Sequence, residues 1–164
     1  MLNIRKAKIE DIKDITKIYN YAILKTNATF DTKEKSIEEQ KKWFKQHGKK
    51  NPIIVAELDN IIIGFASLNK YSSKLAYSDT VEISLYLLEE YHNKGYGKKL
   101  MDSIIKEGRK AGVHVILSRI TEGNEKSIYL HESVGFELVG VMREVGFKFG
   151  KRLNVYLMQK IFSI

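Results

Sequence analysis

The sequence predicts an α/β (or α+β) protein of one domain, residues 1–164, in which helices flank a mixed sheet. Two apolar runs within residues 52–68 are joined at Asp59-Asn60, which is typical of a β-hairpin and hence of antiparallel strands. Residues 80–120 read as strand, helix and strand, the order of a crossover between parallel strands. The length suits a single domain, and no repeat or proline-rich linker divides the chain.

The elements before the hairpin follow from hydrophobic periodicity and one capping signal. Residues 3–7 are expected to form a short strand. In residues 10–24 the apolar side chains recur at helical spacing, which predicts an amphipathic helix. A second helix is expected at residues 36–47, because Ser36 and Glu39 have the spacing of a capping box.

The elements after the hairpin alternate between strand and helix patterns. Residues 80–87 alternate polar and apolar side chains, as a half-buried strand does. A helical pattern covers residues 95–112, and the apolar run that follows predicts a buried strand at 113–120. A short helix and two strands that complete the sheet are expected at residues 124–136, 137–150 and 153–162.

The composition excludes several kinds of site. The chain has no cysteine, so disulfides, thiolate metal sites and a cysteine nucleophile are excluded, and the histidine spacing implies no metal site. No apolar run approaches the roughly 20 residues that cross a bilayer, and the charged N-terminus does not resemble a secretory signal. We therefore expect a cytoplasmic protein. The net charge of +8 fits a solvated basic face, an anionic cofactor or nucleic acid, although the lysines are dispersed.

A glycine-rich turn, Gly-Tyr-Gly-Lys-Lys, opens the helix expected at residues 95–112. The first N–H groups of a helix are unpaired and carry partial positive charge, so a turn that lets a ligand approach them is an anion site suited to pyrophosphate. Neighbouring lysines would add charge. A purely structural tight turn remains the alternative. Leu100 stands where a dinucleotide fingerprint needs a third glycine, and the spacing is not that of a P-loop.

Residues 92–97, His-Asn-Lys-Gly-Tyr-Gly, resemble the acetyl-CoA pyrophosphate loop of the GNAT superfamily of N-acetyltransferases, Q/R-x-x-G-x-G/A, with His92 in place of Gln or Arg. Further segments are similar in order and spacing to the phosphinothricin acetyltransferase-like subfamily, which includes methionine sulfone and sulfoximine acetyltransferases. They are IYNYAILKTNATFDT, WFKQH, AYSDTVEISLYL, IYLHESVGF, EVGFKFGKRL and MQK.

This resemblance implies a fold, a reaction and an assembly. The mostly antiparallel, twisted sheet is expected to splay between the Glu82 strand and the strand at residues 113–120. The enzyme would move the acetyl group of acetyl-CoA, its cosubstrate, to the primary amine of a small amino-acid-like acceptor by direct attack. The resemblance also implies a homodimer, to which the apolar strand at residues 153–162 would contribute.

Two residues are expected to carry the catalysis. An amine is protonated at neutral pH, so it needs a base before it can attack a thioester. Glu82 shares one strand face with Thr80, Ser84 and Tyr86; the pattern alone fits a solvated carboxylate, and the resemblance implies the catalytic base. His131 occupies a position where many GNAT enzymes have tyrosine, which implies an acid or proton relay near the thioester sulfur, with a structural histidine as the alternative.

The resemblance also implies which residues hold the two substrates. Coenzyme A is expected on the Leu87 N–H, an oxyanion donor, and on Leu88, Glu89, His92, Asn93, Lys94, Gly95, Tyr96, Gly97, Lys98, Lys99, Leu100, Asn124 and Ser127. Asn124 would equally serve as a helix N-cap. The acceptor pocket is expected to comprise Phe30, Thr32, Lys74, Leu75, Ala76, Tyr77, Ser84, Leu85 and Tyr86.

The choice of acceptor stays open at the level of sequence. Lys74 would pair with a carboxylate or phosphinate of the acceptor, or be a solvated loop lysine. Lys74, Leu75 and Arg152 depart from the residues that relatives often carry, so the acceptor does not transfer from the resemblance. The alternatives are an acetyltransferase for a protein N-terminus, lysine or polyamine, and a non-catalytic module that binds coenzyme A or nucleic acid. Such a module would not need Glu82 and His131 together.

Overall fold

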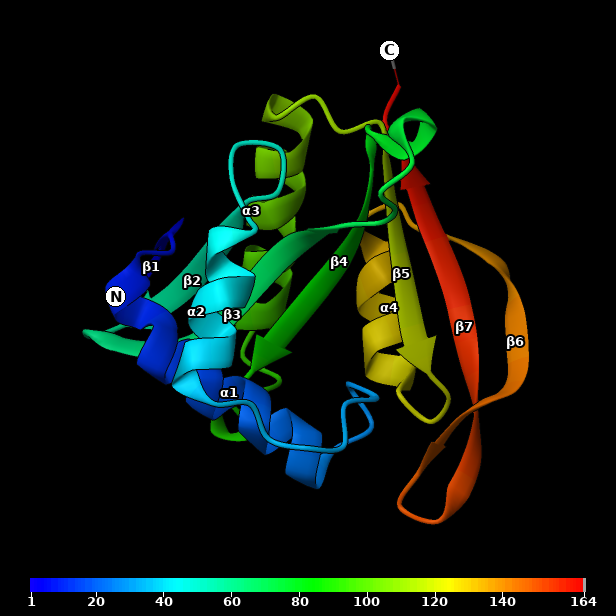
Figure 1. Cartoon of the computed structure of the whole chain (residues 1–164), viewed down its shortest axis with the longest axis horizontal. Coiled ribbons are helices and arrows are strands. Elements are labelled where there is room, and N and C mark those ends of the chain that lie inside the picture. Colours follow the sequence, from blue (N-terminus) through cyan, green and yellow to red (C-terminus); the bar gives the residue numbers. More distant parts are fainter. Residues whose placement is uncertain (164) are drawn as a thin grey trace.

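The structure is a computed structural model that describes residues 1–163, and its centre is one seven-stranded sheet in the order β1-β2-β3-β4-β5-β7-β6 (Figure 1). Neighbouring strands are antiparallel except for β4 and β5, which are parallel. The expected mixed, mostly antiparallel sheet is therefore confirmed. The strands are β1 Leu2–Lys6, β2 Ile53–Leu58, β3 Ile61–Lys70, β4 Thr80–Leu87, β5 Val115–Thr121, β6 Glu137–Lys148 and β7 Lys151–Ile161.

Helices cover both faces of the sheet (Figure 1). Helices α1 and α2 pack over β2 and β3 around Ile15, Val55 and Phe65. On the opposite face α3 packs around Leu68 and Ile104, in a core that α4 also borders. The helices are α1 Ile12–Lys25, α2 Ile37–Lys45, α3 Tyr96–Lys110 and α4 Glu125–Ser133, with 3-10 turns at Ile9–Asp11, Leu75–Tyr77 and Glu89–Tyr91. None of these helices is long and apolar enough to cross a membrane.

Two local signals act as the sequence predicts. Asp59 and Asn60, with φ of 48° and 68°, join β2 to β3 in the left-handed conformation that a tight hairpin turn requires. At the start of α2, the Ser36 hydroxyl accepts the N–H of Glu39 at 3.1 Å, and the Glu39 carboxylate accepts the N–H of Ser36 at 2.7 Å. Both capping-box contacts satisfy backbone donors that the helix itself cannot pair.

The sheet splays between β4 and β5, as expected. Their parallel pairing covers only three positions and ends at Glu82, which lies opposite Leu117. Strand β4 nevertheless stays paired with β3 as far as Leu87. The gap therefore opens at Glu82 and widens toward the end of β4. Because side chains alternate along a strand, Val81 and Ile83 are buried on the α3 and α4 face, while Glu82 points toward α1 and α2.

The C-terminal part of the sheet is a hairpin whose second strand lies inside the sheet. The strand expected at residues 153–162 is β7, which lies between β5 and β6. Its side chains Leu153, Val155 and Met158 are buried. The edge strand is β6, which forms a long hairpin with β7 that reaches below the rest of the sheet (Figure 1).

Candidate active site

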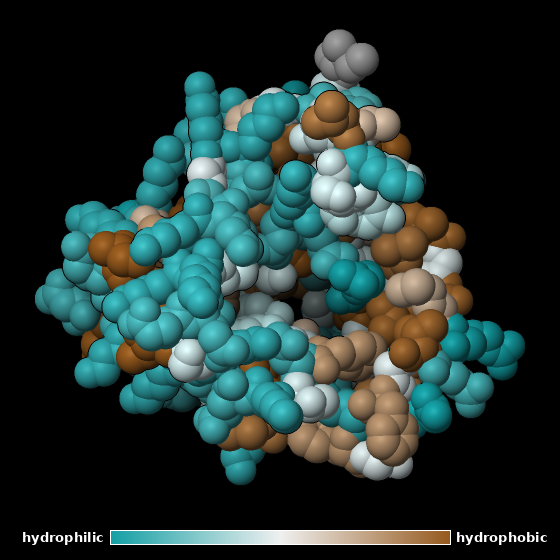
Figure 2. All heavy atoms as spheres, in the orientation of Figure 1, coloured by the Kyte–Doolittle hydropathy of each residue, from teal (hydrophilic) through white to brown (hydrophobic). Residues whose placement is uncertain are grey.

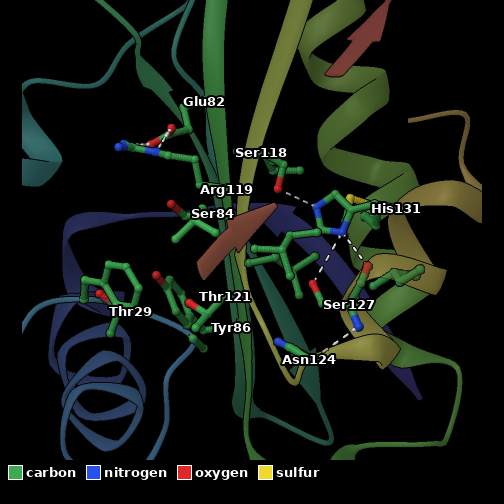
Figure 3. A pocket seen from close by; sticks show the side chains of 18 of the residues that line it. Thr29, Glu82, Ser84, Tyr86, Ser118, Arg119, Thr121, Asn124, Ser127 and His131 are labelled. Atoms are coloured by element: carbon green, nitrogen blue, oxygen red, sulfur yellow. Dashed lines mark hydrogen bonds and ion pairs between the residues drawn. The ribbon is translucent and has the colours of Figure 1, made fainter. Parts of the chain in front are cut away.

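A cavity of about 480 Å³ occupies the gap between β4 and β5 (Figure 3). The same face of the molecule is visibly hollowed near its middle in Figure 2. Strands β4 and β5, helices α1, α3 and α4, the loop after α1 and the β6–β7 hairpin supply the walls. The polar side chains on these walls are those of Tyr19, Thr29, Glu82, Ser84, Tyr86, Ser118, Arg119, Thr121, Asn124, Ser127 and His131.

Glu82 forms a two-pronged ion pair with Arg119 across the gap (Figure 3). The Arg119 Nε donates to Oε2 at 2.6 Å, and Nη2 donates to Oε1 at 2.7 Å. The parallel register places Glu82 opposite Leu117, so Arg119 is two residues farther along β5 and leaves the strand on the same face. The hydrogen bonds to Glu82 raise the pKa of Arg119, so the guanidinium stays charged.

His131 lies on the other side of the gap and is 5% exposed. Its Nδ1 is 2.6 Å from the Ser127 carbonyl, which can only accept, so Nδ1 carries a proton. Its Nε2 is 2.9 Å from the Ser118 hydroxyl. Burial lowers the pKa of His131, and the contact with the Ser127 carbonyl opposes this shift only in part. The imidazole is therefore neutral near pH 7, and Nε2 accepts the Ser118 proton.

The glycine turn begins α3 beyond the end of the gap. Gly95 is the N-cap, with a φ of 81° that side-chain-bearing residues seldom adopt. The first intrahelical bond is donated by Lys99 to the Gly95 carbonyl at 3.3 Å, so the N–H groups of residues 96 to 98 have no partner within the helix. The Nζ of Lys94 lies 5.4 Å from the centroid of the Tyr91 ring. This end of α3 is a basic, donor-rich surface that suits an anion.

The end of β4 shows which backbone groups are engaged. The Leu88 N–H donates to the Ile63 carbonyl at 2.9 Å. The carbonyl of Leu88 accepts the Tyr91 N–H at 3.0 Å. Successive N–H groups of a strand point to opposite sides, so the Leu87 N–H faces the gap. The His92 ring is bonded to the Leu87 carbonyl at 2.8 Å. Leu87 can therefore donate into the gap, whereas the Leu88 N–H is occupied by β3.

The residues matched by the acetyltransferase (GNAT) domain family are 4–156, nearly the whole chain. The chain belongs to the GNAT acetyltransferase family. A curated L-methionine sulfoximine/L-methionine sulfone acetyltransferase from Salmonella typhimurium is 35% identical over 96% of the chain and 93% of the relative.

Two solved structures agree with this membership. An acetyltransferase from Salmonella typhimurium with its cofactor acetyl-CoA has a TM-score of 0.96 at 33% identity, over 100% of this chain and 95% of that one. A GNAT phosphinothricin acetyltransferase from Sinorhizobium meliloti in complex with acetyl-CoA has a TM-score of 0.94 at 32% identity, over 98% and 88% of the two chains.

The acceptor residues expected in this GNAT chain divide into two groups. Phe30, Ser84, Leu85 and Tyr86 line the cavity, and burial raises the pKa of Tyr86 to about 12. The segment from Lys74 to Tyr77 is an exposed loop with a 3-10 turn that lines neither this cavity nor the one beside it. Thr32 is exposed and also lies outside both cavities.

A second cavity of about 380 Å³ adjoins the first on the α1 and α2 face of the GNAT sheet. Tyr19, Glu82, Ser84 and Tyr86 border both cavities. The Tyr19 hydroxyl contacts Asp31 and lies 3.0 Å from that of Thr29. The rest of the second cavity is lined by Asp31, Lys35, Glu39, Gln40, Trp43, Phe65, Ser67 and Asn69.

Asn124 serves as the N-cap of α4, the alternative that the sequence left open. Its Oδ1 accepts the N–H of Ser127 at 3.3 Å. Asn124 and Ser127 both line the cavity, on the same side of the gap as His131 (Figure 3). The cap uses the amide oxygen, so the amide NH₂ can still serve a ligand in the gap.

Three polar residues that organise this GNAT site were not predicted from the sequence. Ser118 and Arg119 fall within a run read only as a buried strand, although an arginine at one alternate position of such a run signals a polar face. Lys148 is 5% exposed, and its Nζ donates to the carbonyls of Thr26 and Thr29 at 2.8 and 2.7 Å. These contacts hold the loop before Phe30 against β6. The two partners are more than one hundred residues apart, and no local sequence pattern predicts such a contact.

Proposed function

We propose that this chain transfers the acetyl group of acetyl-CoA to the primary amine of a small amino-acid-like acceptor. The observation that carries the proposal is the position of Glu82. Its carboxylate stands where β4 and β5 part, and it borders both cavities on the α1 and α2 face. A thioester threaded through the gap would meet an amine from that face beside this base.

The coenzyme would approach from the α3 end of the gap. The unpaired N–H groups of residues 96 to 98 and the basic side chains of Lys94, Lys98 and Lys99 suit its pyrophosphate. The pantetheine arm would run beside β4 toward Glu82, past Asn124 and Ser127. Because the Leu87 N–H faces this gap, it is the proposed donor to the thioester oxygen.

The proposed reaction is a direct transfer. Glu82 takes a proton from the ammonium of the acceptor, either by contact or through one water molecule. The amine nitrogen then bonds to the thioester carbon, and collapse of the tetrahedral intermediate breaks the C–S bond. The products are an N-acetyl amine and the thiolate of coenzyme A, which takes up the second proton that the nitrogen loses, while Glu82 returns the first proton to solvent. In the resting state His131 Nε2 accepts from Ser118, so we propose that His131 orients this hydroxyl as a relay rather than acting first as an acid.

The test is release of the coenzyme A thiol with a panel of acceptors. Methionine sulfone, methionine sulfoximine and phosphinothricin should be turned over well, and aminoacyl peptides, lysine side chains and spermidine poorly. Glu82→Gln should lower kcat by about 10²- to 10⁴-fold. Full turnover by this variant with a good acceptor would remove Glu82 from the mechanism. Preference for peptides or spermidine would favour the other acceptor classes, and salt-dependent nucleic-acid binding without turnover would favour a non-catalytic module.

We also propose a homodimer whose interface lies on β6 rather than β7. The edge strand exposes Val139, Val141, Val145 and Phe147, and Phe149 is exposed in the turn that follows it. The flank formed by the β6–β7 hairpin and its surroundings carries much of the hydrophobic surface visible in Figure 2. Sedimentation equilibrium should give twice the chain mass, and Phe147→Asp should give the monomer. We place this enzyme in the cytoplasm, where acetyl-CoA is available, and cell fractionation tests that placement.

A further inference from the structure

Arg119 offers unused hydrogen-bond donors to the cavity. A guanidinium carries five N–H groups in a planar fork. Arg119 directs Nε–H and one Nη2–H at the carboxylate of Glu82. Both Nη1 protons and the second Nη2 proton therefore lie on the outer edge of the fork. The side chain is 59% exposed and lines the first cavity, and its guanidinium hydrogen bonds among the described residues are the two to Glu82.

The charge arrangement of the pair complements one kind of acceptor. An α-amino acid carries an ammonium and a carboxylate on the same carbon. Glu82 and Arg119 present a carboxylate beside a guanidinium, so each group of the amino acid can face its opposite charge. The outer edge of a guanidinium binds a carboxylate with two parallel hydrogen bonds. An acceptor bound in this way has its amine beside Glu82.

We propose that Arg119 is the specificity-determining residue for the acceptor: its outer edge binds the α-carboxylate and thereby places the α-amine beside Glu82. This inference rests on the proposed function and names the part of the acceptor that the site recognises. Ser84 and Tyr86, which border both cavities, would then contact the acceptor side chain.

The other cations near the site are placed less well for this role. Among the described residues that line the first cavity, Arg119 is the one with a permanent positive charge. Lys148 is buried and donates hydrogen bonds to two backbone carbonyls. Lys35 lies in the second cavity and pairs with Asp31 at 3.7 Å. Lys74, the residue that the sequence suggested, lies on an exposed loop outside both cavities.

The experiment compares each amino acid with its carboxamide, which keeps the α-amine and lacks the negative charge. The measured quantity is the ratio of kcat/KM for the acid to kcat/KM for the amide, at one pH. The wild-type enzyme should favour the acid. Arg119→Gln should reduce this preference about 10- to 100-fold, the usual effect of losing hydrogen bonds to a charged group. Arg119→Lys keeps the charge without the fork and should give an intermediate preference.

A control and a rival variant make the result decisive. Arg109→Gln, on the last turn of α3, removes an equal charge far from the cavity and should leave the preference unchanged. Circular dichroism and melting curves would establish that Arg119→Gln is folded. The proposal is overturned if Arg119→Gln keeps the preference of the wild type, or if Lys74→Gln abolishes that preference in its place.

The outcome also separates this inference from the proposed function. If the wild-type enzyme acetylates amino acids and the preference survives in Arg119→Gln, only the assignment of Arg119 fails. If the wild-type enzyme acetylates no amine, the proposed function fails. Calorimetric titration of the acid and the amide into both proteins then decides on Arg119, because the acid should bind more tightly than the amide only when Arg119 is present.

Discussion

Ser118 and Arg119 are adjacent on β5, and their side chains leave the strand on opposite faces to hold the two candidate catalytic residues. The Ser118 hydroxyl bonds Nε2 of His131 at 2.9 Å, and Arg119 bonds Glu82 at 2.6 and 2.7 Å. Since β4 has separated from β5 at this level, Glu82 and His131 lie on the two sides of one gap. One dipeptide thus positions the base on the proposed acceptor side and the imidazole on the coenzyme side.

The buried His131 should make stability depend on pH. Burial lowers its pKa in the folded protein, so the unfolded chain binds a proton more readily. The free energy of unfolding should therefore be full above the unfolded value of about 6.5 and should fall as the pH drops below it. Urea unfolding between pH 7.5 and 5 measures this slope. His131→Gln should have a shallower slope, and an unchanged slope would contradict the neutral, buried imidazole.

Lys148→Met should loosen the loop that carries Phe30. The substitution leaves the partly buried carbonyls of Thr26 and Thr29 without their donor, which should cost about 1–3 kcal/mol of stability. The KM for the acceptor should rise while the KM for acetyl-CoA stays near that of the wild type. Thermal melts and two-substrate kinetics measure these effects. Lys151→Met, at the exposed start of β7, is the matched control and should change neither quantity.

Gly146 and Phe30 should show strong coupling in a double-mutant cycle. A Cβ at position 146 would lie 2.2 Å from Cε2 of the Phe30 ring, so the ring must move. Gly146→Ala should destabilise the protein by about 1–3 kcal/mol through overpacking. In a Phe30→Ala background the same change should cost much less, because the obstructing ring is gone. Additive effects in urea unfolding would mean that the two residues do not meet in solution.

The two glycines of the α3 turn should respond differently to alanine. Gly95 has a φ of 81°, so Gly95→Ala should lose about 1–2 kcal/mol of stability. At Gly97 the added Cβ would meet only Leu130 at 3.8 Å, an ordinary contact, so Gly97→Ala should fold normally. If the N-terminus of α3 holds pyrophosphate, Gly97→Ala should still weaken acetyl-CoA binding measured by titration calorimetry. Wild-type affinity in this variant would argue against close approach of the phosphates.

The local structure of this protein could be predicted from the order of its residues. The hairpin turn at Asp59-Asn60, the capping box from Ser36 to Glu39 and the glycine at the start of α3 depend on residues within a few positions of one another. Such signals act through backbone dihedrals and short-range hydrogen bonds, so they can be read from a single chain. The alternation along β4 likewise separated Glu82 from the buried Val81 and Ile83.

The contacts between residues far apart in the chain could not be predicted in this way and became known from the folded structure. Periodicity assigns a side chain to a face but does not say which strand lies beside it. The hydrogen-bond partners of Glu82, His131 and Lys148 could therefore not be predicted. The strand order β5-β7-β6 could not be predicted from periodicity either. This order places β7 inside the sheet and β6 at its edge. The pairing of Glu82 with Arg119 depends on the divergence of two parallel strands, a property of the whole sheet rather than of either segment.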